Sequence, residues 1–319
     1  MDIGALPPGV PQNWADVRPL LRSILRPATY RSFAKPGDPL AWRIPLTAFL
    51  HELVAIDLPE MRLIVTMDIT DQWGVSGTDL FIAGRENIAG LHPPGSFEPG
   101  TEGVLVDADQ SSYITSAILT PGWLAALARP DGPRPVAFVP TEDTLILGND
   151  GNAQLFDTAE QMYYQSDRGV SPEAFTVGAD RNLAPFLDSG PHSLRRRAIQ
   201  ARTTGAVRQY GEQAQFLTEL YDEQTIEGYV AATDVVDTGH GMRSAAVWGE
   251  GVLHELPEVD YLFFINDDGH FAVPFSVVVD LVGIRPTPGY FPPRYRVTDW
   301  PEPSVISALR AHAVTLPTG

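Results

Sequence analysis

Residues 52–88 read ELVAIDLPEMRLIVTMDITDQWGVSGTDLFIAGRENI, and residues 135–147 read PVAFVPTEDTLIL. Each stretch holds two short runs of aliphatic residues separated by a tight turn, a pattern typical of paired antiparallel strands. In the first stretch the turn is Pro59-Glu60, and a helix is predicted to follow from an N-cap at Ser76. The two stretches therefore predict an α+β fold, in which hairpin-rich, mainly antiparallel sheets are flanked by short helices.

Elements of the same kind are predicted in both directions from these stretches. Apolar residues recur at helical spacing over Trp14–Leu25, so a helix is predicted there, kinked at Pro19. Near the C-terminus, Asn266-Asp267-Asp268-Gly269 predicts a hairpin turn, because an Asp-Gly step tolerates positive φ. Further strands are predicted at Leu40–Ile44, Val104–Val106, Tyr229–Val236, Ser244–Trp248, Tyr261–Ile265 and His270–Phe275, and further helices at Pro121–Ala128, Asp157–Ser166, Gln213–Leu220 and Ser304–Val314.

The length of 319 residues and a change in composition together predict two domains. The change falls at residues 185–192, PFLDSGPH, after which a run of arginines begins. We expect residues 1–34 to form an N-terminal helical lead-in and residues 35–188 to form the first α+β domain. Residues 189–319 would then form a second, β-rich α+β domain.

The chain is acidic, with 40 Asp and Glu residues against 22 Lys and Arg residues and a formal net charge of −18. Such a surface repels nucleic-acid phosphates and anionic lipid headgroups, so neither is expected as a partner, whereas a basic protein partner is favoured. The absence of cysteine excludes disulfides, thiolate nucleophiles and cysteine-ligated metals. No apolar run approaches about 18 residues and the N-terminus lacks a signal-peptide pattern, so a soluble, cytoplasmic protein is expected.

The region from about residue 45 to residue 180 resembles the YtpQ-type family of bacterial proteins, known as a domain of unknown function. In that family a strand ends in an aspartate, a threonine precedes an acidic helical turn, and the next helix ends in an asparagine followed by an aliphatic residue. The residues that carry the resemblance here are Val54-Ala55-Ile56-Asp57, Ile64-Val65-Thr66, Trp73-Gly74-Val75-Ser76, Glu86-Asn87-Ile88 and the second signature, Val136–Leu147.

The resemblance implies that this region has the α+β fold of a bacterial domain family. It does not imply an activity. The family tends to place an arginine before the aspartate in the turn of the second signature. This chain has Glu142 before Asp143 at that place. An activity that depended on that arginine would therefore not be shared through this turn.

No motif of a common enzyme class is present, so no catalytic residue and no cofactor are predicted. The chain lacks the Gly-x-Ser-x-Gly elbow, the phosphate loop and the dinucleotide-binding glycine pattern. As an alternative, a metal-assisted hydrolase could use His240, His254, Asp267 and His270, which are predicted near strand ends. Two histidines and one carboxylate can hold a metal whose bound water attacks a carbonyl or phosphoryl group. The same residue types are also common in turns.

Two further charged groups have both a functional and a structural interpretation. Asp107 and Asp109 share one face if they belong to one strand, where they could bind calcium or act as acid and base. They could equally lie at a solvated strand end. A basic run could bind phosphate or an acidic peptide, but in so acidic a chain we expect it to pair with the protein's own carboxylates. This run consists of Arg195, Arg196, Arg197, Arg202 and Arg208.

The predicted partner-binding residues are four aromatic side chains near the C-terminus, set among five prolines between Pro286 and Pro301. Aromatic residues anchor many protein interfaces. In the alternative interpretation, these rings seal the core beneath a proline-stiffened loop. The sequence thus predicts a non-catalytic protein-binding or scaffold protein that acts through its second domain, with the metal-assisted hydrolase as the alternative. The four side chains are those of Tyr290, Phe291, Tyr295 and Trp300.

Overall fold

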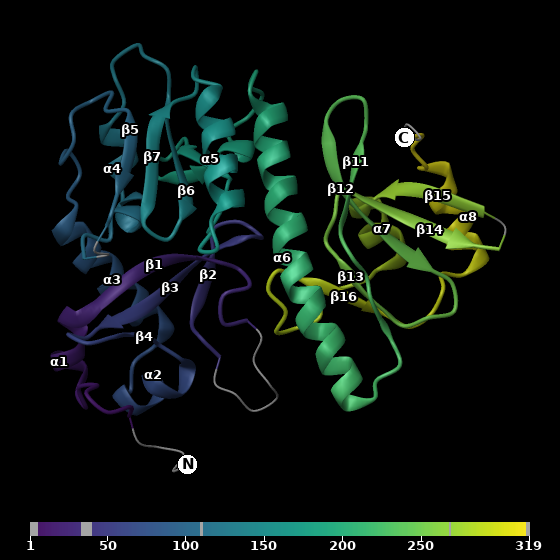
Figure 1. Ribbon diagram of the computed structural model, residues 1–319, viewed down its shortest axis with the longest axis horizontal. Coiled ribbons are helices and arrows are strands. Elements are labelled where there is room, and N and C mark those ends of the chain that lie inside the picture. The colour runs from purple at the N-terminus through teal and green to yellow at the C-terminus, as the bar shows by residue number, and fades with distance from the viewer. Residues whose placement is uncertain (1–5, 33–39, 109–110, 268, 317–319) are drawn as a thin grey trace. The chain divides into compact units, whose positions relative to one another are not determined.

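The computed structural model describes residues 6–32, 40–108, 111–267 and 269–316. The chain divides into two compact units, unit 1 (Met1–Ala198) and unit 2 (Ile199–Gly319). Both units combine short helices with mainly antiparallel sheets, which confirms the predicted α+β class (Figure 1). The division falls inside helix α6 (Arg195–Gln224) and not in the predicted loop at residues 185–192. Within the part of the chain that is described, no helix has both the length and the apolar character needed to cross a membrane.

Strand β3 (Leu50–Asp57) is the centre of the first sheet of unit 1 and is buried along almost its whole length. It pairs antiparallel with β1 (Leu21–Pro27) on one edge and with β2 (Arg43–Pro45) and β4 (Arg62–Ile64) on the other. The hairpin that joins β3 to β4 turns at Pro59-Glu60, as predicted.

The helix predicted over Trp14–Leu25 is only partly correct. Helix α1 (Trp14–Val17) and the short 3-10 helix η1 (Arg18–Leu20), which contains Pro19, are followed directly by strand β1. Leu21, Ile24 and Leu25 are buried. An apolar run that is buried on both faces does not alternate, and it therefore gives no clear strand signal. Because β1 pairs with β3, the predicted lead-in is an integral part of unit 1.

Helix α3 (Gly77–Leu91) begins at the predicted N-cap, Ser76. The Ser76 hydroxyl accepts a bond from the Asp79 amide at 3.2 Å, and the Asp79 carboxylate accepts one from the Ser76 amide at 3.1 Å. This reciprocal capping box satisfies two amides that the first turn leaves without partners. Helix α2 (Met67–Trp73) precedes it, and α3 packs on β1 and β3.

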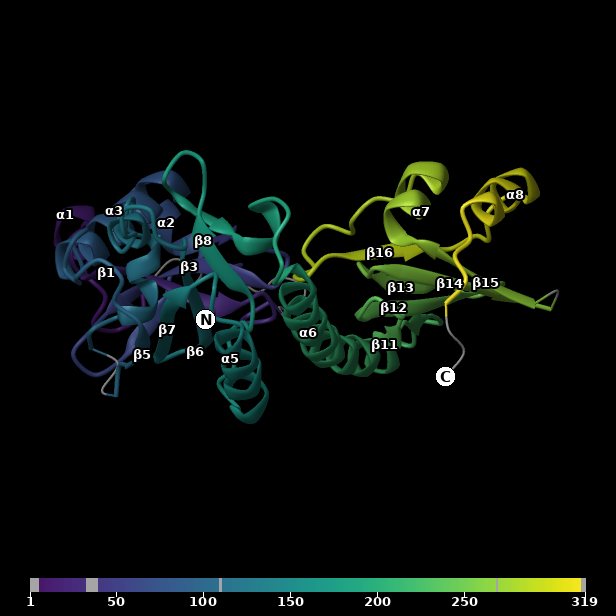
Figure 2. The ribbon, with the colours of Figure 1, turned by 90° about the horizontal axis from the view of Figure 1, so that it is seen from above.

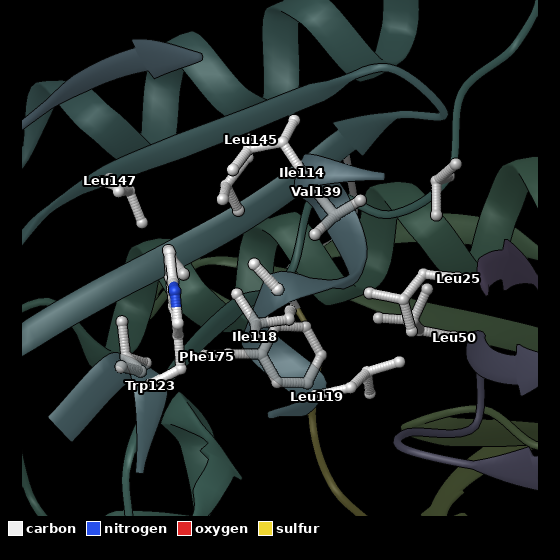
Figure 3. Packing of buried hydrophobic residues seen from close by; sticks show 14 of the residues in the cluster. Leu25, Leu50, Ile114, Ile118, Leu119, Trp123, Val139, Leu145, Leu147 and Phe175 are labelled. Atoms are coloured by element: carbon white, nitrogen blue, oxygen red, sulfur yellow. The ribbon is translucent and has the colours of Figure 1, made fainter. Parts of the chain in front are cut away.

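The second sheet of unit 1 contains the predicted hairpin, β6 (Pro135–Thr141) and β7 (Thr144–Asn149), within an antiparallel sheet of order β5-β7-β6-β8-β9. Because side chains alternate along a strand, each face of this sheet has its own core. Ala137 and Val139 pack toward 3-10 helix η2 (Ile114–Leu119) and helix α4 (Trp123–Ala126) (Figure 3). Val136 and Phe138 pack toward α5 (Gln154–Gln165) and η3 (Phe186–Asp188). The other strands of this sheet are β5 (Gly103–Val106), β8 (Ala174–Val177) and β9 (Leu183–Pro185).

Unit 2 contains two sheets, with strand orders β11-β12-β14-β15 and β10-β13-β16. Strands β14 (Tyr261–Asn266) and β15 (Gly269–Pro274) form the predicted C-terminal hairpin. Asp268 of its turn lies outside the described residues. Helices α7 (Phe275–Val282) and α8 (Pro303–Ala311) pack against this hairpin and lie on one side of the four-stranded sheet (Figure 2). The other strands are β10 (Tyr229–Val230), β11 (Asp234–Asp237), β12 (Met242–Gly249), β13 (His254–Pro257) and β16 (Arg294–Val297).

Candidate functional site

The structure gives the four predicted partner-binding aromatics different environments. Tyr295 is 6% exposed, packs edge-on against Phe275 and donates to Glu258 Oε2 at 3.1 Å. Tyr295 is therefore a core residue, as the alternative interpretation proposed, and offers no exposed surface to a partner. Tyr290 and Phe291 are half-buried in the loop before β16. Trp300, also half-buried, lines a groove of about 570 Å³ in unit 2.

We call this hollow the Trp300 groove. It lies where the connection after β16 meets helix α8, the end of β14 and the turn after β12, all within unit 2. Its lining combines an aromatic ring, two prolines and an isoleucine with five polar or charged side chains. The lining residues are Glu250, Asn266, Trp300, Pro301, Glu302, Pro303, Ile306, Ser307 and Arg310.

A row of aromatic rings holds Trp300 in place. The Trp300 ring packs edge-on against Trp248 of β12, with centroids 5.9 Å apart, and against Phe264 of β14, with centroids 5.6 Å apart. Phe264 in turn stacks on Phe271 of β15 at 5.1 Å. Such pairs add about 0.5–1.5 kcal/mol each beyond the apolar area that they bury. The indole is thus fixed before any partner arrives.

Helix α8 supplies one wall of the groove. Glu302 occupies its N-cap position and Pro303 its first turn, where a missing N–H costs nothing. From Pro303 the groove residues follow at helical spacing, at Ile306, Ser307 and Arg310, so they share one face of the helix. The Arg310 guanidinium lies 4.6 Å from the centroid of the Phe271 ring.

The two carboxylates of the groove are not paired within the described part of the chain. Among the described residues, neither Glu250 nor Glu302 forms a hydrogen bond or ion pair with its carboxylate, and both residues are exposed. Some other acidic side chains are paired, as Glu142 is with Arg168 and Asp157 is with Arg197. The lining holds two carboxylates and one guanidinium, so it carries a net negative charge at neutral pH.

A second polar cluster in unit 2 was missed by the sequence analysis. The fully buried Glu255 accepts bonds at Oε1 from the Tyr221 hydroxyl and from Arg296 Nε, each at 2.6 Å. Its Oε2 is buried without a partner among the described residues. Burial, and then the bond to Glu255, raise the pKa of Tyr221. Burial opposes the charge of Arg296, but the bond to Glu255, the charge of that carboxylate and the nearby Tyr221 and Tyr290 together outweigh burial and raise the pKa of the guanidinium.

Arg294 is a second buried charged residue in this region, and it connects several elements of unit 2 by hydrogen bonds. It is fully buried, and its guanidinium donates to Gln213 Oε1 and to the carbonyl oxygens of Ala231, Glu255 and Tyr210 at 2.6–3.1 Å. These bonds connect α6, β13 and the segment after β10. Burial lowers the pKa of Arg294 to about 10. Because Glu255 and Arg294 are both closed off from solvent, we interpret this network as structural. Its two arginines, Arg294 and Arg296, flank Tyr295 in the sequence, but no local sequence pattern indicates which residues they would bind.

The four residues of the alternative metal site are not assembled into one. Within the described residues, no group of three or more His, Asp or Glu side chains could hold a metal ion. His254 is buried in β13, where Nδ1 contacts the Val252 carbonyl at 2.9 Å and burial lowers its pKa. His240, Asp267 and His270 are exposed, in the turn before β12 and around the β14–β15 turn. The turn chemistry explains these residues better than ligation does.

Several of the remaining charged candidates have structural partners. Asp107 is buried, and its carboxylate accepts bonds from the amides of Ser112 and Tyr113 at 3.1 and 2.7 Å. Asp109 lies outside the described residues. The expected pairing of the basic run with carboxylates holds for two of its five arginines. Arg197 pairs with Asp157 and Arg208 pairs with Glu212. Arg195 donates to the Leu187 carbonyl, and among the described residues no carboxylate pairs with Arg195, Arg196 or Arg202.

Comparison of the chain with protein-family models, with curated proteins and with solved structures gives no significant match. The resemblance to the YtpQ-type family therefore stays a prediction. The function has to be argued from the geometry and charge of the Trp300 groove.

Proposed function

We propose that this chain is a protein-binding protein, and that the Trp300 groove takes a basic segment of a protein partner. The observation that carries the proposal is a fixed indole that lines the same groove as two unpaired carboxylates, Glu250 and Glu302. Tryptophan is among the residues that contribute most to protein interfaces. A lysine or arginine side chain beside it gains from the ring face and from the carboxylates together.

The charge of the whole chain supports the same partner. With a formal net charge of −18, the protein attracts a basic segment from a distance and raises its rate of association. The groove then adds apolar contacts through Trp300, Pro301 and Ile306, which are independent of salt. Binding should therefore weaken as salt is added but should not vanish.

The test is a fluorescence-anisotropy titration of the full chain with a labelled Gly-Lys-Lys-Leu-Lys-Lys-Gly peptide. The same peptide with glutamate in place of lysine should not bind. The double variant Glu250→Gln with Glu302→Gln should bind the basic peptide about two- to thirtyfold more weakly, because each partly exposed ion pair contributes about 0.2–1 kcal/mol.

The matched control removes the same two charges outside the groove, in the variant Glu227→Gln with Asp234→Asn. Both of these residues are exposed in unit 2 and neither lines the groove. If the control weakens binding as much as the groove variant does, the binding is a general charge effect and the proposal fails. It fails also if the basic peptide does not bind the native chain.

A further inference from the structure

Unit 1 contains a pocket of about 470 Å³, a volume typical of small-molecule sites. The pocket reaches from the core, where Ile118 and Phe175 are 1% exposed, to the surface at Pro45, Pro121 and Asn182. Both sheets and helix α3 contribute to it. The complete lining is Ile44, Pro45, Leu46, Arg85, Ile118, Leu119, Thr120, Pro121, Phe175, Asn182, Leu183 and Pro185.

The inner wall of the pocket is apolar and well packed. Figure 3 shows Ile118, Leu119 and the Phe175 ring gathered at one end of the core between η2 and β8. Leu46 and Leu183 pack against the same core from the rim. An apolar part of a ligand would therefore exchange water for aliphatic and aromatic contacts, at about 25 cal/mol per Å² of buried surface.

Arg85 is the one charged residue of the lining, and its orientation is fixed. Its Nε donates to Glu52 Oε1 at 2.9 Å, and its Nη2 donates to Oε2 of the same carboxylate. Glu52 is fully buried in β3 and also accepts a bond from the Ser23 hydroxyl at 2.7 Å. Among the described residues, Nη1 of Arg85 has no hydrogen-bond partner. Both N–H donors of Nη1 are thus left on a guanidinium that the Glu52 carboxylate holds through two of its other N–H groups.

The charge around Arg85 determines which ligand group suits these donors. Glu52 neutralises the guanidinium at hydrogen-bond distance, so an incoming carboxylate would meet a neutral pair and would add a net negative charge. At the rim, Asn182 donates to Asp180 at 2.9 Å, which brings another carboxylate close to the pocket. A carbonyl oxygen accepts the same bonds without adding charge, and a bond to an ionised donor is stronger than one between neutral groups.

We infer that this pocket binds a neutral, mostly apolar small molecule whose carbonyl oxygen accepts hydrogen bonds from Nη1 of Arg85. The amide of an acyl chain has this chemistry, with the chain against Ile118, Leu119 and Phe175. This site is separate from the proposed partner-binding groove, because all of its lining belongs to unit 1.

The probes are octanamide and octanoate, which share a chain and differ in charge at the head group. Ligand-observed NMR titrations of the full chain should show that octanamide binds and that octanoate binds more weakly. Arg85→Lys keeps a cation beside Glu52 but loses the second nitrogen, so octanamide should bind about tenfold more weakly to it. Octanoate should be affected less.

Leu183→Trp tests the pocket without touching the Arg85–Glu52 pair. The larger ring should fill the rim and abolish octanamide binding. Leu91→Trp is the matched control, because Leu91 is exposed at the end of α3 and does not line the pocket. Tighter binding of octanoate than of octanamide would overturn the inference. So would octanamide binding that survives Leu183→Trp, or the absence of octanamide binding to the native chain.

Discussion

His51 shows most clearly how a single residue links the stability of this protein to pH. It lies in β3 at the centre of the first sheet of unit 1 and is 2% exposed. Burial, assisted by the nearby Arg43 guanidinium, lowers the pKa of His51 to about 3 from an ordinary value of 6.5. The folded protein therefore holds this imidazole neutral at pH values where the unfolded chain would protonate it.

The direction of the effect follows from linkage. Between pH 6.5 and about pH 3 the unfolded chain binds one more proton at His51, so the free energy of unfolding falls as the pH falls. The slope approaches about 1.4 kcal/mol per pH unit. Urea unfolding at pH 7 and pH 5 should thus give a difference of about 2 kcal/mol from this residue.

The variant His51→Gln should lose most of that difference, although it can be less stable at pH 7. The control is His312→Gln, because His312 is exposed and should leave the pH dependence unchanged. Equal pH dependence in His51→Gln and in the native chain would show that this histidine is not held neutral by the fold.

Residue patterns alone identified some of these environments and missed others. The turn residues around Asp267 and His270 were correctly given a structural alternative, because turn chemistry is local. The partners of the buried Glu52 and Glu255 were not predicted, since Arg85 and Arg296 lie 33 and 41 positions away in the chain. Such contacts depend on which strands become neighbours, and a single sequence does not show that.

At the scale of elements, two of the glycines in helix α3, Gly84 and Gly90, have opposite effects on stability. A Cβ at Gly84 would lie 2.7 Å from Ser23 Oγ and 3.0 Å from the Ser23 amide nitrogen, so the glycine lets the helix approach β1. That approach places Arg85 beside Glu52. At Gly90 a Cβ would meet nothing within 4 Å.

Gly84→Ala should therefore destabilise the protein by about 1–2 kcal/mol, because the cost of overpacking exceeds the gain in helix propensity. Gly90→Ala should instead stabilise it by a few tenths to about 1 kcal/mol. Chemical denaturation of the two variants gives the comparison. A stabilised Gly84→Ala protein would show that α3 does not approach β1 as closely as described.

Elements with strong local signals were predicted correctly. The cap at Ser76, the turn at Pro59-Glu60 and the hairpin turn that ends at Gly269 each depend on a few neighbouring residues. The prediction was wrong where tertiary burial overrides local periodicity, as at Leu21–Leu25, which forms a strand. In α8 the predicted first residue, Ser304, lies inside the helix, because Pro303 already begins it after Glu302.

At the scale of the whole molecule, the pattern of short strands and helices predicted both the α+β fold class and the mainly antiparallel sheets. The groove could be predicted only in part. Trp300 was identified as a candidate anchor from its aromatic and proline-rich surroundings, whereas Glu250 and Asn266 come from distant segments that the fold brings into the same groove. Conversely, Tyr295 satisfied the same sequence pattern but is buried in the core.

The central claim is that a basic segment binds at the Trp300 groove. The most direct measurement is a ¹H–¹⁵N correlation spectrum of the full chain during titration with the lysine peptide, followed at the indole N–H signals of the six tryptophans. The Trp300 signal is assigned by its loss in Trp300→Phe. The account predicts that this signal moves most, together with the amides of α8. A peptide that binds while the Trp300 indole signal stays in place would contradict it.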